Sequence, residues 1–468
     1  MLKCRVMQKF VASFTILSMF FLHGCLRVNT DPQPVFAEVQ QDVLTRTGHT
    51  ACWDTCPDEA AFKSCIESTL EQELTEDLVV YIALLNNRQL QATYENLGIA
   101  KAQLVQAGLL RNPIFALSYR FSTKSTVTDL IDIGLFQNFL EALLIPLKKR
   151  MAASELEATQ AMVTTQILDV IAQTKIAFCD FQALEQIWTL KKQVLLAAES
   201  SYDAARRLFE AGNIKDLELT ANRTFYEQTK VELASLEVVV LKSRERLNVL
   251  MGLWGNQINW KASICLPIAL ENESDWGDIE SCAIANSLDL AIARKQIYAT
   301  AAGFGIDTTR IVFPQLEIGP SSERDEGVWF VGPAITLGIP LFDFGQAVSA
   351  AAQAEILRQW NRFTALAVDI RSAARIARIH VLNTHRQSQY FQKILVPLAE
   401  QLTSLTLLQH NAMQLGVFHL LSAKLQELEK KIQAVEHLRD YWTARTELEM
   451  ILNGHIMQKN TFEISMKK

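Results

Sequence analysis

One stretch of this chain is almost free of the residues that interrupt helices. Between Pro146 and Gly252 the sequence contains no further proline and a single glycine, Gly212. Alanine, leucine, glutamate, glutamine, lysine and arginine dominate the stretch, and these residues favour helix. The pattern predicts two long helices joined at Gly212, of which the first, 146–211, would extend about 100 Å. No compact globular domain needs a helix of that length.

The same arrangement recurs about two hundred residues later. Its members are Pro340, Gly416 and Gly454, which follow the proline and the two glycines above by 194, 204 and 202 residues. Pro113 and Pro314 extend the correspondence upstream, at a separation of 201 residues. A period this long indicates an internal duplication rather than a short solenoid repeat. Each unit should contain a helix, two short strands, a long helix, a glycine turn and a second long helix.

The duplication sets the expected organisation of the chain. We expect a signal peptide (1–24), an N-terminal arm (25–75), a first repeat (76–252), a linker (253–275), a second repeat (276–454) and a tail (455–468). The arm contains several prolines and lacks periodicity, which predicts an extended segment with one short helix near 59–71. A helix should follow from Glu76 to Leu110, because Pro113 disfavours its continuation.

Three further expectations concern the long helices. Pro146 suits the first turn of a helix, where a missing N–H is harmless. Asp343 precedes Gln346 by three residues, the spacing of a capping box, and is expected to be the N-cap of the second long helix. Pro397 lies within that helix and should kink it, because a proline there removes a backbone hydrogen bond.

Composition and motifs exclude several classes of function. The net charge of −6 and the isoelectric point near 5.9 provide no basic surface for DNA or RNA, so nucleic acid is not an expected partner. The chain contains no GxSxG, HExxH or phosphate-binding glycine loop, and its histidines lack ligand spacing with carboxylates. We therefore predict no enzyme activity, no cofactor and no bound metal.

The cysteines leave an open question. Eight cysteines are too few for a disulfide scaffold, and their spacing fits no standard zinc pattern. In an oxidising compartment the group at the N-terminus and the pair around the linker could form disulfides, although a metal site is the alternative. The residues concerned are Cys52, Cys56, Cys65, Cys265 and Cys282, and the sequence does not determine their pairing.

The N-terminus has the pattern of an export signal. Basic residues precede an apolar run of about thirteen residues, 10–22, which is too short for an ordinary membrane span. The run ends in Leu22-His23-Gly24-Cys25, which resembles the bacterial lipobox, although His23 stands where that pattern has a small residue. The resemblance implies that Cys25 is lipidated and is the first residue of the mature chain. The alternative is an ordinary secretory signal followed by an incidental cysteine.

Four segments alternate between apolar and polar residues, as strands with one apolar face do. Two lie near 114–121 and 130–139 in the first repeat, and two near 312–319 and 329–339 in the second. Each is close to the length of a tilted transmembrane strand, with aromatic residues near its ends. We expect the apolar face to contact lipid through Phe115, Leu117, Leu135, Trp329, Ile335 and Leu337.

Alternation also occurs in soluble β-sandwiches, but helices of about 100 Å could not cover these strands as a core. Four strands are too few to close a membrane barrel, and open strand edges are not tolerated in lipid. The chain should therefore pool its strands with those of further copies. The helices after each glycine turn carry apolar residues at coiled-coil spacing, among them Leu219, Tyr226, Leu233, Val240 and Leu247.

Four segments carry a family resemblance. They are Ala83-Leu84-Leu85-Asn86-Asn87, Leu109-Leu110-Arg111-Asn112-Pro113, Leu208-Phe209-Glu210-Ala211-Gly212-Asn213 and Pro340-Leu341-Phe342-Asp343-Phe344-Gly345. They resemble the repeated landmarks of the TolC-like outer-membrane efflux proteins, and the likeness extends from about Glu76 to Gly454. The first repeat departs from the family in having Leu144-Ile145-Pro146-Leu147-Lys148-Lys149-Arg150 where the second has the usual Phe-Asp-x-Gly turn.

The resemblance implies a mainly α-helical fold with membrane β-strands. Three copies would form one twelve-stranded outer-membrane β-barrel that is continuous with a periplasmic α-helical barrel. It implies an exit duct fed by an inner-membrane transporter through a periplasmic adaptor protein, in a chain that also contacts outer-membrane lipid. The alternative is a lipid-tethered periplasmic coiled-coil scaffold without channel activity. The transported substrate, the pump and the residues that gate the tunnel are not determined by the sequence.

The resemblance also implies that the adaptor docks on the two glycine tips. The residues concerned are Arg207, Leu208 and Gly212 in the first tip and Leu415 and Gly416 in the second. A glycine at each tip would supply the left-handed residue that ends the preceding helix. Leu208 and Leu415 are expected to be exposed, because a tip at the end of a tube has nothing within its own chain to cover them.

Overall fold

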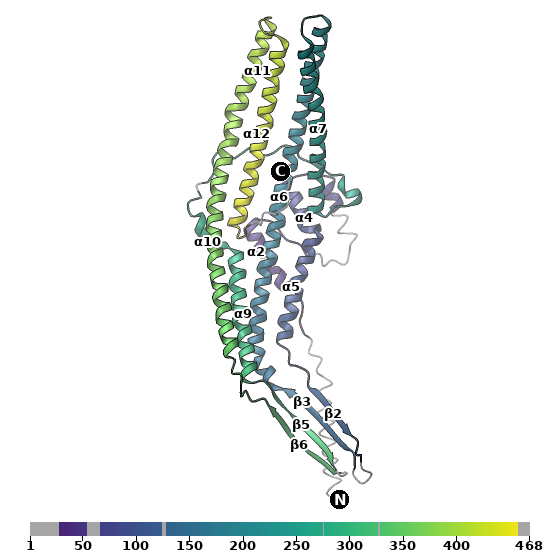
Figure 1. Cartoon of the computed structure of the whole chain (residues 1–468), viewed down its shortest axis with the longest axis vertical. Coiled ribbons are helices and arrows are strands. Elements are labelled where there is room, and N and C mark those ends of the chain that lie inside the picture. Colours follow the sequence, from purple (N-terminus) through teal and green to yellow (C-terminus); the bar gives the residue numbers. More distant parts are fainter. Residues whose placement is uncertain (1–27, 54–65, 124–127, 275, 326–327, 457–468) are drawn as a thin grey trace.

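The computed structural model describes residues 28–53, 66–123, 128–274, 276–325 and 328–456. The molecule is elongated, with long helices along most of its length and four strands at one end (Figure 1). Two helical hairpins form the opposite end, so the strands and the hairpin tips are separated by the full length of the helices (Figure 1). Among the helices of these residues, none is both long enough and apolar enough to cross a membrane.

The N-terminal arm contains a helix that was not expected. Residues 33–47 form α2 (Gln33–Thr47), where the prolines had predicted an extended segment. Pro34 lies in the first turn of α2, where its missing N–H does no harm. The helix buries Phe36, Val39 and Val43 in a cluster that includes Tyr94. Most of the short helix expected at 59–71 lies outside the described residues.

The first repeat follows the expected order of elements. It comprises α4 (Glu76–Asn86), α5 (Arg88–Ala107), β2 (Ile114–Arg120), β3 (Leu130–Asn138), α6 (Phe139–Glu210) and α7 (Asp216–Met251). The expected helix 76–110 is two helices, because Asn87 ends α4 and caps α5 by accepting a hydrogen bond from Leu90 N at 3.1 Å. The expectation for Pro146 was wrong: α6 begins at Phe139, so this proline lies inside the helix.

The second repeat has the same order with one interruption. It comprises α8 (Ile279–Asn286), α9 (Leu288–Val312), β5 (Leu316–Asp325), β6 (Val328–Leu337), α10 (Gln346–Tyr390), η2 (Phe391–Leu395), α11 (Val396–Asn411) and α12 (Val417–Leu452). The element η2 is a π-helical turn that ends two residues before Pro397, and a kink at that proline stays a prediction. Asp343 is not an N-cap: α10 begins after Gly345, and Asp343 Oδ1 accepts from Gly345 N at 2.8 Å.

The two repeats share a hydrogen-bonded clamp that confirms the duplication. In the first, the Asn86 side chain donates to Met251 O at 2.9 Å and to Gly252 O at 2.8 Å. In the second, Asn286 donates to Leu452 O at 3.0 Å. Both clamps tie the end of the short first helix to the end of the last helix. The turn residues there are glycines with positive φ, 66° at Gly252 and 108° at Gly454, which favours glycine at both positions.

The strands form one antiparallel sheet in the order β2-β3-β5-β6. Alongside the sheet end, α5, α6, α9 and α10 pack in that order, while α7, α6, α12 and α10–α11 pack in order toward the tips (Figure 1). Two short strands near the middle, β1 (Glu73–Leu74) and β4 (Lys261–Ala262), pair in parallel, and a 3₁₀ turn, η1 (Gly255–Ile258), precedes β4. The described chain is therefore a curved slab with two unpaired sides.

Candidate functional site

The registers of the sheet bring the predicted apolar residues onto one face. Residues opposite each other in adjacent strands share a face. Phe115 pairs with Leu135, and Leu117 pairs with Ile133. In the second repeat the pairs are Leu316 with Leu337, Ile318 with Ile335, and Arg324 with Trp329. Across the junction between the repeats, Ile133 pairs with Ser322 and Ile131 with Arg324, so all six predicted residues lie on the same side.

The opposite face is polar or small at most positions, and its large apolar residues are Ile114, Leu130, Phe136, Val328 and Phe330. It carries Ser118, Arg120, Asp132, Glu323 and Thr336, and Arg120 forms an ion pair with Asp132 at 3.0 Å. Of the six predicted lipid-facing residues, five are exposed in the single chain and Leu135, in a central strand, is half-buried. One face of the sheet is thus largely apolar, with Gln137, Ser322 and Arg324 as polar members, which is the pattern expected of a membrane wall.

The first hairpin tip matches its sequence prediction in backbone geometry. Gly212 has φ +71°, and the bonds Gly212 N to Phe209 O (2.9 Å) and Asn213 N to Leu208 O (2.8 Å) end α6 in a left-handed cap. Arg207 is exposed and forms an ion pair with Asp203 at 2.8 Å. The tip is thus closed by its own backbone and presents charged side chains.

The second tip corrects its prediction. Gly416 has φ −73° and is the N-cap of α12, so it is not the left-handed residue. That conformation is adopted by Met413, at φ 59°, and Gln414 N donates to Gln409 O at 2.9 Å to complete the cap. A left-handed non-glycine residue costs roughly 1–2 kcal/mol, so this turn carries strain that the first does not. The sequence pattern failed because it assigned the turn to the nearest glycine.

The exposure of the tip leucines was also predicted wrongly. Leu208 and Leu415 are both half-buried, and Leu415 O lies 2.9 Å from His410 Nδ1. The exposed apolar residues are Phe209, Leu217 and Met413, with 40%, 79% and 95% of their surface accessible. Docking on these tips would therefore use neighbours of the residues named from the sequence.

The two unpaired sides of the slab are apolar along much of their length. One side consists of β2, α5 and α7, and the other of β6, α10 and α11, in the order of packing given above. Exposed apolar residues on α7 include Val231, Val238, Leu241 and Val249. Those on α10 and α11 include Leu357, Val368, Ile379, Leu398, Leu405 and Leu408. Stripes of this extent normally mark a protein interface.

A buried histidine ties the end of the second repeat to both halves of the slab. His455 lies between Asp289 on α9, at 2.9 Å, and Asp169 on α6, at 3.3 Å. Burial lowers the pKa of His455, but the two carboxylates outweigh it and raise that pKa to about 9. The imidazole is therefore charged at neutral pH. Next to this junction, Arg46 of α2 donates to Asn286 O at 2.9 Å and to Asn453 O at 2.6 Å.

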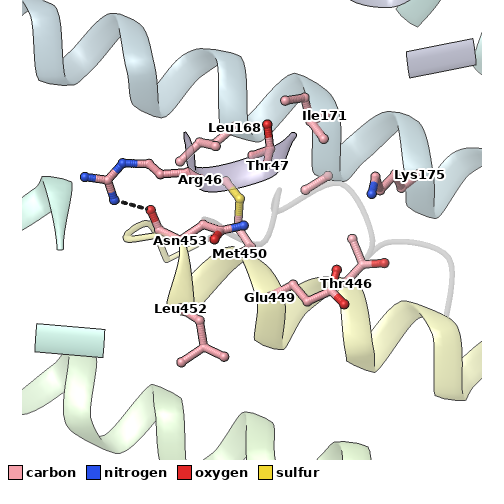
Figure 2. Close-up of a pocket in the computed structure, with 11 residues that line it drawn as sticks. Arg46, Thr47, Leu168, Ile171, Lys175, Thr446, Glu449, Met450, Leu452 and Asn453 are labelled. Carbon is pink, nitrogen blue, oxygen red and sulfur yellow. Dashed lines mark hydrogen bonds between the residues drawn. The ribbon is translucent and has the colours of Figure 1, made fainter. Parts of the chain in front are cut away.

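A cavity of about 240 Å³ lies beside this junction, between α2, α6 and α12 (Figure 2). Arg46, Lys175 and Glu449 provide its charges, and Leu168 and Met450 provide apolar walls. Lys175 is paired with Glu76, and Glu449 with Arg445. Its charged groups are thus already engaged within the fold. Nowhere in the described ranges do three or more histidine, cysteine or acidic side chains gather as a metal site.

Only some of the predictions for the cysteines can be compared with the structure. Cys25, Cys56 and Cys65 lie outside the described residues. Cys52, Cys179, Cys265 and Cys282 are free thiols, and Cys265 and Cys282 are both exposed. The pair that flanks the linker is therefore reduced in this structure.

Comparison with known proteins agrees with this architecture. Residues 79–253 match the family described as outer membrane efflux protein. The chain is 22% identical over 387 residues to the probable efflux pump outer membrane protein TtgC of Pseudomonas putida, covering 76% of each chain. It is 23% identical over 432 residues to the cobalt-zinc-cadmium resistance protein CzcC of Cupriavidus metallidurans, covering 90% of this chain and 96% of CzcC.

Solved structures show the same fold. A crystal structure of CusC, which concerns conformational changes that accompany folding and transmembrane channel formation, superposes on this chain with a TM-score of 0.67. The two chains are 13% identical, and the superposition covers 82% of this chain and 93% of CusC. Together with the match of residues 79–253 to the outer membrane efflux protein family, these findings show that the chain is similar to outer membrane efflux proteins.

Proposed function

We propose that this protein is the outer-membrane exit duct of a tripartite efflux system. The observation that carries the proposal is the sheet: one face is largely apolar, the other carries most of the charged residues, and both edge strands are free in the described part of the chain. A single chain of this shape cannot reside in lipid, because its unpaired strand edges would have no hydrogen-bond partners there. Closure with further copies removes the edges and leaves an apolar outside and a polar inside.

Three copies would close the ring with twelve strands. The sheet alternates in direction from β2 to β6, so β6 of one copy can pair antiparallel with β2 of the next. The same contact would join α5 and α7 of one copy to α10 and α11 of its neighbour, which covers the apolar stripes on both sides. Such a contact joins two different surfaces and forms a closed ring when the rotation is right.

Assembly and conduction test this proposal together. Native mass spectrometry in detergent should give a particle of three chains, and the same sample should conduct ions in a planar bilayer. Val231→Asp on α7 or Leu405→Asp on α11 should break the ring, because each places a charge in an apolar seam. Met162→Asp is the control: Met162 is also exposed but lies on α6, which has neighbours on both sides within its own chain. A monomer with normal conductance would refute the proposal.

We also propose that the hairpin tips dock a periplasmic adaptor, which connects the duct to an inner-membrane transporter. The exposed Leu217 and Met413 beside the tip turns support this, since no part of the described chain covers them. The double variant Leu217→Asp/Met413→Asp should assemble normally and lose export, whereas Leu208→Asp should also disturb folding because Leu208 is half-buried. Parental export by a correctly assembled double variant would exclude the tips as the docking surface.

Lipidation of Cys25 completes the proposal. Its support is the lipobox-like sequence 22–25, which follows an export signal. Mass spectrometry of the mature N-terminus should show a diacylglyceryl cysteine at position 25. A mature chain that begins at another residue without lipid would contradict it.

A further inference from the structure

The junction between the sheet and the helices has an unusual surface. Large apolar side chains continue beyond the ends of the strands and are exposed there; they are Leu110, Phe139, Leu143, Ile339, Leu341 and Phe342. Leu143 is 69% and Phe342 95% exposed, although neither belongs to a strand. The apolar band of the sheet therefore extends about one helical turn past its strands.

Cations without acidic partners lie next to this band in the first repeat. Glu141 is the only carboxylate between residues 138 and 154, and it binds both Lys148 and, at 3.1 Å, Arg310 of α9. No ion pair in the described part of the chain involves Arg111, Lys149 or Arg150. Three positive charges thus remain uncompensated in a protein whose net charge is −6.

The arrangement of these residues points to the surroundings of the duct rather than to a neighbouring copy. α6 packs against α5 on one side and α9 on the other, so its exposed residues do not lie on the free sides of the slab. Phe139, Leu143 and Arg150 follow each other at spacings of four and seven residues, which places them along one side of α6. The side chain of Lys149 lies close to the end of α5: a Cβ atom added to Gly108 would be 3.5 Å from Lys149 Cδ.

The order along the helix is apolar first and cationic second. Arg150 lies about 16 Å of helix beyond Phe139. Long basic side chains reach back along apolar surface while their charge stays in a polar layer. Aromatic and basic residues at the end of a membrane wall are typical of the interface with lipid headgroups.

The far end of the sheet has the opposite chemistry. Its charged residues are mainly carboxylates, and one of the two arginines described there, Arg120, is bound to Asp132. The acidic residues are Asp129, Asp132, Glu323 and Asp325. Among the described residues, the helix end of the sheet therefore carries three cations without ion pairs, whereas the far end carries one, Arg324, among four carboxylates.

We propose that Arg111, Lys149 and Arg150 bind the phosphate headgroups of anionic phospholipids in the periplasmic leaflet. The inference rests on the proposed function, because it requires the sheet to lie in the membrane. Juxtamembrane cations attract anionic headgroups, each contributing about fivefold to binding. The site exists in the first repeat alone, since the corresponding segment of the second repeat carries no basic residue between Leu341 and Arg358.

Lipid selectivity tests the proposal. Native mass spectrometry of the assembled protein in mixed micelles of phosphatidylglycerol and phosphatidylcholine should show preferential retention of phosphatidylglycerol. The triple variant Arg111→Gln/Lys149→Gln/Arg150→Gln should lower that preference roughly a hundredfold, from about fivefold per cation. If the triple variant fails to assemble, each single variant should lower the preference by about fivefold.

The control removes the same charges elsewhere. Arg223→Gln/Lys242→Gln/Arg246→Gln takes one lysine and two arginines from exposed positions on α7 and should leave the preference unchanged. Glycerol phosphate in excess should not displace the bound lipid; displacement would show a free-phosphate site and overturn the lipid assignment. A trimer that conducts normally but binds both lipids equally would refute this inference and leave the duct intact. Failure to insert or conduct in any lipid would refute the duct itself.

Discussion

The two repeats have the same elements in the same order, yet they solve equivalent problems with different residues. In the first, Asn86 is buried and clamps two carbonyls; in the second, Asn286 is exposed and clamps one, with Arg46 from the N-terminal arm binding nearby. The first tip turns at a glycine and the second at Met413. The duplication has preserved where the backbone must turn or be tied, and it has not preserved which side chain does it.

The charge of the two tips differs even more. Residues 401–423 of the second hairpin contain no aspartate, glutamate, lysine or arginine, and His410 and His419 are their only titratable side chains. The first tip carries Asp203, Arg206, Arg207 and Glu210 before Gly212, and Lys215 and Asp216 after it. A partner that contacts both tips therefore meets one charged and one uncharged surface, which makes the two contacts non-equivalent.

The largest expected effect should be the same in both repeats. Leu117→Arg in β2 and Ile335→Arg in β6 each place a charge on the apolar face and should cost roughly 2–4 kcal/mol of unfolding free energy in lipid. Ser118→Arg and Thr336→Arg, on the other face, should be mild. Urea titration in liposomes measures all four. If Leu117→Arg and Ser118→Arg lowered the unfolding free energy equally, the two halves of the sheet would not be equivalent.

The clamps should differ in strength. Asn86→Ala leaves the carbonyls of Met251 and Gly252 without their partner in a buried site and should cost about 2–3 kcal/mol. Asn286→Ala removes one exposed bond and should cost about 1 kcal/mol. Chemical unfolding of the two variants compares them directly. Equal losses would mean that the burial difference between the repeats has no energetic consequence.

His455 should make the stability of the protein pH-dependent above neutral pH. The pKa of His455 is raised to about 9, so its contribution is complete below about pH 6.5 and is lost as the pH rises through 9. His455→Gln should therefore destabilise the protein at pH 7 by about 2 kcal/mol. The gap between variant and wild type should close by pH 10. A gap that stayed constant from pH 7 to pH 10 would exclude a charged imidazole between Asp169 and Asp289.

The smallest effects should appear at the tips and have opposite signs. Gly212→Ala should destabilise the first hairpin by about 1 kcal/mol, because alanine resists positive φ. Met413→Gly should be neutral or stabilising by about 0.5 kcal/mol, because relief of strain exceeds the entropy of the added glycine. Gly416→Ala should have little effect at φ −73°. Thermal unfolding in detergent measures these changes in stability. If Gly416→Ala were destabilising and Met413→Gly were not stabilising, the left-handed residue of the second turn would be Gly416 after all.

Most of the fold could be predicted from long-range patterns in the sequence. Helix length, the duplication and the alternating strands follow from spacing in the sequence, and the registers place Phe115, Leu135 and Trp329 on one face as alternation required. Local chemistry was less reliable. The sequence did not predict α2, because prolines such as Pro34 favour a loop, although Phe36, Val39 and Val43 have helical spacing.

The candidate site was predicted in outline only. Leu208 and Leu415 were expected to be exposed because they adjoin the turns, but each hairpin folds its leucine against its own helices. Such packing depends on the rotation of a helix end, which periodicity over so few residues does not determine. The identity of the left-handed residue depends likewise on where the last hydrogen bond of α11 forms. The residue type of Met413 does not indicate that its φ is positive.

The two free sides of the slab have a genetic consequence. Because each copy joins its neighbours through different surfaces, a variant damaged on only one side can still enter a ring through the other and then prevent its closure. Expressed at equal levels with the wild-type gene, such a variant would leave about one ring in eight without a defective copy, if three copies assemble at random. Val231→Asp should therefore be dominant, whereas a variant that cannot fold at all should be recessive.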